Sequence, residues 1–192
     1  ERRAVGQLTS VISPSQAITT ARPLPSQIDT RAISAGVRLI GSDLAQATDR
    51  GTAVHEALRI LLCRPDLRGR VSQHCRVSDA EVELLEQQAQ ALRQTLAKLG
   101  YPRLHIEQPI EIALTDGGHQ SIIVDLIAEG AEGFIIIDHK SGPIADHAAR
   151  FESYWPQLAA YIDAVGDRGG KPVNGAAVFW TETGELTLGL GI

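Results

Sequence analysis

The sequence predicts a domain of mixed α and β structure (α/β or α+β), in which helices flank a central mixed β-sheet. Three observations support this fold class. Apolar residues recur every three or four positions in residues 42–62 and 78–100, as they do on the buried face of a helix. Between residues 104 and 140 the period changes to two, which is typical of half-buried strands. A further helical stretch and two strand-like runs follow.

Length and composition suit one globular domain. The chain has 192 residues, of which 43% are hydrophobic and 21% are charged. It lacks the ~18 consecutive apolar residues of a membrane span and the apolar core of a signal peptide, so we expect a cytoplasmic location. The chain contains no Met, even at position 1, which suggests a fragment of a longer protein.

Charge and cysteine content exclude some classes of function. A net charge of −5 argues against a protein that coats nucleic acid without specificity, but it does not exclude a nuclease, because acids that hold metal ions make the balance negative. Cys63 and Cys75 form no CxxC pair, so this chain alone cannot build a thiolate zinc site or a four-cysteine iron–sulfur cluster.

The N-terminal quarter differs from the rest. Residues 1–47 carry prolines among Ser and Thr and show weak periodicity, which predicts a linker or a loosely packed arm, with the domain proper at residues 48–192. Thr48 and Asp49 are the candidates for the N-cap of the first helix. Residues 63–78 are expected to form a loop.

The second helix carries the clearest signal. Ser78 and Asp79 are candidate caps, and Gly100 follows the last turn. Its apolar positions are spaced by three and four residues and are Val82, Leu85, Ala89, Leu92, Leu96 and Leu99.

Strands are expected at residues 104–114, 120–129 and 133–140, joined by tight turns as an antiparallel meander. A helix at 150–166 must place Pro156 in its first turn or kink there. The last two strands, within residues 173–190, are expected to turn around Thr183 and Gly184.

Three charged residues stand out in the meander. Asp138 and Lys140 lie two residues apart and share one strand face, while Asp125 interrupts an apolar face of the preceding strand. If the two strands pair as a hairpin, the two carboxylates lie about equally far from the turn and repel each other unless a cation lies between them. Two such carboxylates suit Mg²⁺ or Mn²⁺, and Lys140 could orient or deprotonate a water or neutralise charge on a phosphoryl group. The alternative for Asp138 and Lys140 is a plain salt bridge at a strand end.

The pattern of Asp125 followed by Asp138-His139-Lys140 resembles the core of the PD-(D/E)XK nuclease superfamily. This resemblance implies a restriction-endonuclease-like fold and a metal-dependent phosphodiester hydrolase. His139 is expected to point away from its neighbours, so that only its backbone carbonyl could face a metal ion.

Three further motifs resemble the RecB-type branch of this superfamily, which occurs in RecB and AddA helicase–nucleases and in stand-alone exonucleases. "GTAVHEAL" resembles the GxxxH helix of that branch and places His55 at the metal site. "HIEQPIEI" resembles its acidic strand and favours Glu107, although Glu111 lies on the same strand face. "YWPQLAAY" resembles its YxxQLxxY helix and places Gln157 and Tyr161 on one face.

The resemblance covers residues 48–190 and implies a Mg²⁺- or Mn²⁺-dependent DNA nuclease of double-strand break repair and recombination. The implied partners are DNA, in particular single-stranded DNA, and helicase domains of the same or a partner chain. The implied metal ligands are His55, Glu107, Asp125 and Asp138, and the implied catalytic residues are Asp125, Asp138 and Lys140. Gln157 and Tyr161 would contact DNA or brace the site.

Two other functions remain open at this point. The domain could be a catalytically silent module that binds DNA or assembles a repair complex, or it could hydrolyse small phosphoesters. The chain has no GxxxxGK[ST] helicase motif, and it lacks the four cysteines of the iron–sulfur relatives.

Overall fold

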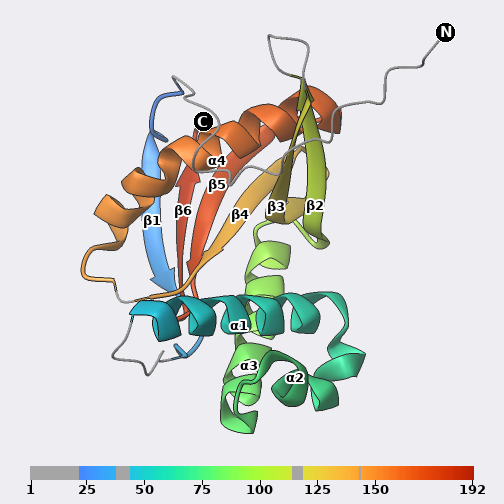
Figure 1. The fold of residues 1–192 in the computed structure, drawn as a ribbon. Coiled ribbons are helices and arrows are strands. Elements are labelled where there is room, and N and C mark those ends of the chain that lie inside the picture. The colour runs from blue at the N-terminus through green and yellow to red at the C-terminus, as the bar shows by residue number, and fades with distance from the viewer. Residues whose placement is uncertain (1–21, 38–43, 114–118, 143) are drawn as a thin grey trace, which may run out of the picture.

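A computed structural model describes residues 22–37, 44–113, 119–142 and 144–192, and it confirms the predicted mixed sheet flanked by helices (Figure 1). The strands are β1 (Gln27–Ala32), β2 (Arg103–Ala113), β3 (His119–Glu129), β4 (Phe134–Lys140), β5 (Val173–Trp180) and β6 (Glu185–Leu190). The helices are α1 (Leu44–Cys63), the 3-10 helix η2 (Pro65–Leu67), α2 (Arg68–Cys75), α3 (Asp79–Lys98) and α4 (His147–Gly169).

The sheet has the strand order β1-β6-β5-β4-β3-β2. Strands β2, β3 and β4 form the predicted antiparallel meander, and β5 and β6 form the predicted final hairpin. Only β4 and β5, among the described strands, pair in parallel, and α4 supplies the crossover that a parallel pair requires. This crossover places α4 across one face of the sheet (Figure 1).

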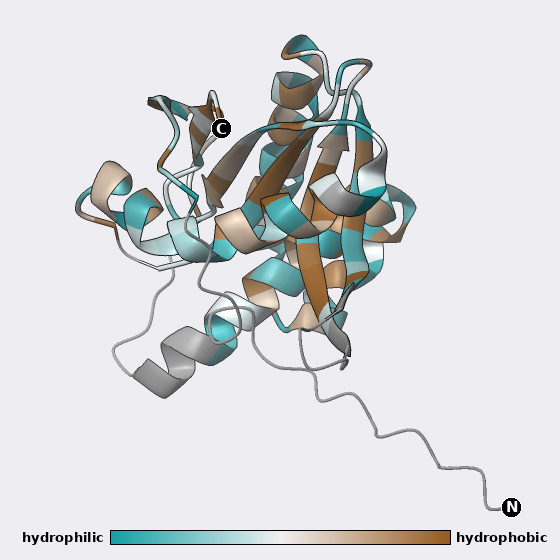
Figure 2. Ribbon diagram, turned by 90° about the horizontal axis from the view of Figure 1, so that it is seen from above, coloured by the Kyte–Doolittle hydropathy of each residue, from teal (hydrophilic) through white to brown (hydrophobic). Residues whose placement is uncertain are grey.

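Two apolar cores lie on opposite faces of the sheet. On one face α1, α2 and α3 pack against alternate residues of β3 and β4, such as Leu126 and Ile137. On the other face α4 packs through Phe151 and Leu158 against the intervening residues, such as Ile136. The central strands are accordingly apolar, while the helices carry both apolar and polar stretches (Figure 2). Each strand of the sheet centre is therefore buried on both sides.

The ends of α3 are as predicted, whereas the start of α1 is not. Ser78 caps α3 in a reciprocal capping box with Glu81, and the helix ends just before Gly100, which has a φ of 93°. Helix α1 begins at Leu44, so Thr48 and Asp49 lie inside it and the predicted cap is wrong. The preceding Leu-Ala-Gln-Ala residues are good helix formers, which allows the helix to extend upstream.

The predicted loop at residues 63–78 is also wrong, because η2 and α2 occupy most of it. Helix α2 buries only Val71 and Cys75, too few residues to produce a recognisable periodicity in the sequence. Pro156 lies inside α4 and not in its first turn.

Strand β1 falls within the segment that was expected to be a linker or loosely packed arm. It pairs with β6 at the edge of the sheet, and residues 22–37 therefore belong to the folded body where the structure describes them. Five of its six residues are exposed, which leaves no apolar alternation in the sequence to reveal a strand. Residues 1–21 and 38–43 lie outside the described part of the chain, and the boundary at residue 48 stays a prediction.

A buried glutamine connects α3 to the end of β5. The Gln88 side-chain amide donates to the carbonyls of Ala35 and Thr181, at 2.8 and 2.7 Å, and Gln88 is fully buried. Thr181 lines the largest charged pocket of the described residues, so this amide holds one wall of that pocket in place.

We predict that Gln88→Met lowers the free energy of unfolding by about 1–3 kcal/mol, because buried carbonyls lose their donor. Urea unfolding followed by circular dichroism measures the change. Gln90→Met on the exposed face of α3 is the matched control and should change stability by less than about 0.5 kcal/mol. Equal effects of both substitutions would contradict the structural role of Gln88.

Candidate active site

The site lies where β3 and β4 stop pairing. The β3–β4 hairpin is closed by a tight turn in which Gly130 donates to the Gly133 carbonyl at 2.9 Å. Its last backbone pair is Leu126 with Ile137, and the next position in this register brings Asp125 opposite Asp138, as the hairpin predicts. Here the Asp125 carboxylate replaces the backbone partner and accepts the His139 N–H at 2.9 Å.

Strand β2 continues the same line across the sheet. Its pairs with β3 are interrupted at Glu107, the position opposite Asp125. Glu107 has a φ of 46°, a left-handed conformation that is unusual for a residue other than glycine and costs of the order of 1 kcal/mol. Three acids, Glu107, Asp125 and Asp138, are thus aligned on neighbouring strands at the point where regular pairing ends.

Helix α1 brings His55 to this point from the opposite end of the site. The His55 Nε2 atom lies 3.8 Å from an Asp125 carboxylate oxygen, and about a third of the His55 side chain is exposed. Gly51 allows the helix to approach the end of β4, because a Cβ atom there would lie 2.6 Å from the Ser141 hydroxyl oxygen. The GxxxH spacing therefore has a steric function in this fold.

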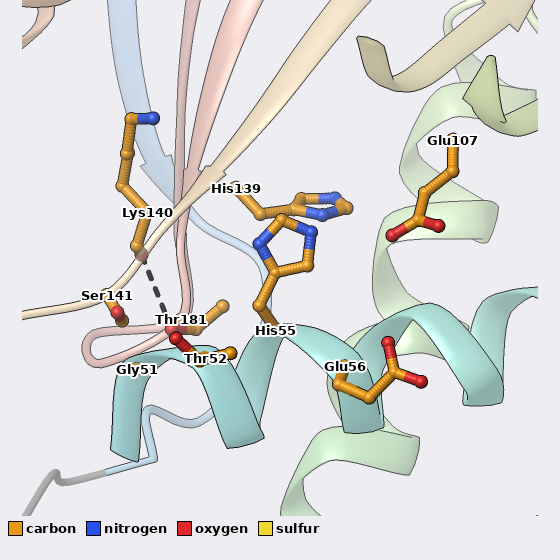
Figure 3. A pocket seen from close by; sticks show the side chains of 9 residues that line it. All are labelled: Gly51, Thr52, His55, Glu56, Glu107, His139, Lys140, Ser141 and Thr181. Atoms are coloured by element: carbon orange, nitrogen blue, oxygen red, sulfur yellow. Dashed lines mark hydrogen bonds between the residues drawn. The ribbon is translucent and has the colours of Figure 1, made fainter. Parts of the chain in front are cut away.

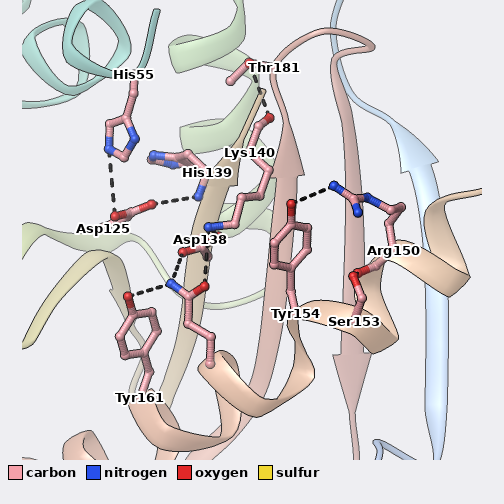
Figure 4. A network of polar contacts seen from close by, with 11 residues as sticks. His55, Asp125, Asp138, His139, Lys140, Arg150, Ser153, Tyr154, Tyr161 and Thr181 are labelled. Atoms are coloured by element: carbon pink, nitrogen blue, oxygen red, sulfur yellow. Dashed lines mark hydrogen bonds and ion pairs between the residues drawn. The ribbon is translucent and has the colours of Figure 1, made fainter. Parts of the chain in front are cut away.

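The His139 ring is the part of the site that the sequence analysis missed. Its side chain does point away from Asp138 and Lys140, as predicted, but this direction leads toward α1 and His55. The two imidazole rings lie edge to face with their centroids 5.6 Å apart (Figure 4). Donor atoms of His55, Asp125 and His139 all lie within 4.8 Å of one another.

Asp138 and Lys140 lie on the other face of β4, toward α4. Lys140 Nζ is 2.7 Å from Asp138 Oδ2, so the strand-end salt bridge exists. The Gln157 amide connects the pair, since its Nε2 donates to Asp138 Oδ1 at 3.0 Å and its Oε1 accepts from Lys140 at 3.4 Å. The same Nε2 contacts the hydroxyl of buried Tyr161 at 2.8 Å. Gln157 and Tyr161 thus brace the pair, one of the two roles expected for them.

The electrostatics of the site are set by burial and by two neighbouring carboxylates. Burial and the charge of Asp125 raise the pKa of Asp138 to about 7, although Lys140 opposes this. Burial lowers the pKa of Lys140, but the attraction of Asp138 outweighs it, and the net shift is upward. Burial lowers the pKa of His139 to about 4, so its ring is neutral at pH 7 and can act as a ligand.

A pocket of about 550 Å³ opens onto the two histidines. Figure 3 shows the His55 and His139 rings at its centre, with the carboxylates of Glu56 and Glu107 to one side and the Lys140 ammonium directed away. Glu107 lines this pocket, whereas Glu111 does not, but Glu107 lies 3.4 Å from Arg59. Arg59 also pairs with Glu56, so these acids form the rim of the pocket and stand apart from the three clustered donors.

The residues present fit a divalent metal ion. Both ring nitrogens of His139 are buried and have no hydrogen-bond partner among the described residues, which is costly for an imidazole unless something binds there. One carboxylate and two imidazoles are common ligands of divalent ions in proteins. His55 and Asp125 are the two predicted ligands that the structure brings together, while Asp138 and Glu107 lie beside them with other partners.

The raised pKa of Asp138 predicts a pH-dependent stability. The folded protein keeps a proton up to about pH 7 that an unfolded chain releases near 3.8, so this contribution is present below about pH 4 and is lost as the pH rises through about 7. Asp138→Asn should therefore stabilise the chelator-treated protein at pH 8 by up to about 4 kcal/mol and have little effect near pH 4. Denaturant unfolding at both pH values tests this.

The exposed Glu152 of α4 provides the matched control. Glu152→Gln should leave the stability difference between the two pH values unchanged. A loss of stability in Asp138→Asn at pH 8 would show that the ion pair with Lys140 outweighs the cost of burying the carboxylate.

Comparisons with known proteins agree with this geometry. The family model for the PD-(D/E)XK nuclease superfamily matches residues 31–187, which include every strand from β2 to β5 and all the site residues described above. No curated protein matches the chain significantly. Within the described residues, no helix combines the length and apolar character that crossing a membrane requires. The chain belongs to the PD-(D/E)XK nuclease superfamily.

Proposed function

We propose that the chain is a metal-dependent DNA nuclease domain of the RecB/AddA type, which hydrolyses phosphodiester bonds within a helicase–nuclease of double-strand break repair. One observation carries this proposal above the others: a lysine ammonium is held by Asp138 and Gln157 beside a cluster of three metal-ligand donors at one strand end. Such a combination suits phosphoryl transfer, in which negative charge increases on the phosphate oxygens.

Each side chain has a defined task in this proposal. His55 and Asp125 would hold Mg²⁺ or Mn²⁺, and Asp138 and Glu107 complete the acidic surroundings that attract the ion. When bound, the ion would polarise the phosphate and lower the pKa of a water molecule. The Lys140 ammonium would orient the attacking water or stabilise charge on the phosphate.

A second pocket, of about 600 Å³, adjoins the first at Ser141 and supports DNA as the substrate. Arg150 and Tyr154 line it, and Arg150 donates to the Tyr154 hydroxyl at 2.9 Å. Lys140 Nζ lies 4.8 Å from the centre of the Tyr154 ring, so the aromatic ring supports both cations (Figure 4). A phosphate backbone that crosses Lys140 would next meet Arg150.

The RecB/AddA assignment rests on the motif order together with the positions of the motif residues. Gly51 and His55 of α1 and Gln157 and Tyr161 of α4 reach the same strand end from opposite faces of the sheet. The net charge of −5 indicates a weak intrinsic grip on DNA, so an adjoining helicase would deliver single-stranded DNA. A cytoplasmic location belongs to the same proposal.

The proposed activity predicts that Mn²⁺-supplemented protein degrades single-stranded DNA and that excess chelator stops the reaction. Asp138→Asn should lower the rate by at least about a hundredfold, because the carboxylate beside Lys140 loses its charge. Release of acid-soluble nucleotides measures the rate, and Glu152→Gln should retain the parental rate.

The same assay separates the alternatives. A silent DNA-binding or assembly module would bind DNA without cutting it under any metal condition. A hydrolase of small phosphoesters would cleave a chromogenic phosphodiester faster than DNA. Parental DNA degradation by Asp138→Asn would contradict the catalytic assignment itself.

Gln157 predicts a different kinetic change. Gln157→Ala frees Lys140 and Asp138 from their shared amide, so kcat should fall by about tenfold or more while KM for DNA stays within about twofold. Steady-state kinetics at saturating Mn²⁺ separate the two constants. A rise in KM alone would instead show that Gln157 binds the DNA strand directly.

A further inference from the structure

The His139 side chain is the buried polar group that the proposed mechanism leaves unused. Only 5% of the residue is exposed, and neither ring nitrogen has a hydrogen-bond partner in the described part of the chain. A histidine that served only to fill the core would be expected to pair at least one nitrogen, because an unpaired buried polar atom costs about 1–3 kcal/mol. The ring therefore lacks the contacts of an ordinary core histidine.

The ring is held in a fixed position. Its own backbone N–H is bound to the Asp125 carboxylate at 2.9 Å, and its face is packed near the Phe179 ring, with centroids 6.0 Å apart. On the side of α1 its neighbour is His55. Three donors from α1, β3 and β4 thus converge within 4.8 Å of one another, and each is positioned by a regular element.

We propose that the His139 imidazole is itself a ligand of the metal ion, so that the site combines two imidazoles with one carboxylate and prefers a transition-metal ion such as Mn²⁺ to Mg²⁺. This inference rests on the proposed function, because it concerns the ion that the nuclease site would hold. It replaces the expectation that only the backbone carbonyl of His139 could serve the metal.

The donor chemistry explains the preference. Mg²⁺ favours oxygen ligands and loses its water reluctantly, whereas imidazole nitrogen suits transition-metal ions. The oxygen-rich alternative would need Asp138 as a first ligand, but both of its carboxylate oxygens are engaged on the other face of β4, by Lys140 and Gln157. The nitrogen-rich side of the strand is therefore the better-prepared place for the ion.

The decisive experiment counts the nitrogen ligands. The whole chain, labelled with ¹⁵N at histidine, is loaded with Mn²⁺ and studied by pulsed electron paramagnetic resonance. We expect coupling to two imidazole nitrogens. Coupling to one nitrogen would overturn the role of His139 and leave the nuclease proposal intact, whereas a failure to bind Mn²⁺ at all would contradict both.

A matched pair of variants tests the selectivity. His139→Phe keeps a ring against Phe179 but removes the nitrogens, so the dissociation constant for Mn²⁺ should rise by about tenfold or more while that for Mg²⁺ changes by less than about twofold. Isothermal titration calorimetry measures both constants. His105→Gln is the control, because His105 pairs with Glu129 away from the three clustered donors.

An unchanged ratio of the two constants in a folded His139→Phe protein would contradict the proposal. If circular dichroism shows that this variant does not fold, the nitrogen count in the parental protein decides the question alone.

Discussion

The end of the β3–β4 ladder is the constraint on which the site depends. Regular pairing stops after Leu126 and Ile137, and the Asp125 carboxylate takes the N–H of His139 that a backbone carbonyl would otherwise accept. A carboxylate in this position satisfies the backbone and still presents its second oxygen to α1, 3.8 Å from His55. The strands can therefore separate without leaving a buried donor unpaired, and the opening between them becomes the place where ligands converge.

Strand alternation then divides the chemistry between two faces. Asp138 and Lys140 face α4, where the Gln157 amide ties carboxylate and ammonium together. The intervening His139 faces α1 and meets a second imidazole. Burying Asp138 beside Asp125 is costly, as its raised pKa shows, and a cation is what lowers that cost. Lys140 supplies one such cation on its face, and the site as a whole is prepared for another on the opposite face.

Periodicity was sufficient to predict the parts of this structure that alternate or repeat clearly. The α3 helix, the meander and the opposition of Asp125 and Asp138 all follow from patterns within continuous stretches of chain. Strand β1 could not be predicted, because its residues are mostly exposed and its identity comes from pairing with the distant β6. The role of the His139 side chain was missed for a related reason: parity shows which face a residue occupies, but not that α1 brings His55 to the same face.

The central claim is that a divalent ion binds at the strand end between α1 and the β3–β4 hairpin. A crystal structure of the Mn²⁺-soaked protein, with the ion located by its anomalous scattering, tests this most directly. The account predicts an anomalous peak in coordination contact with the Asp125 carboxylate and His55 Nε2. A peak held only by the rim acids Glu56 and Glu107, or no peak in the pocket at saturating Mn²⁺, would contradict it.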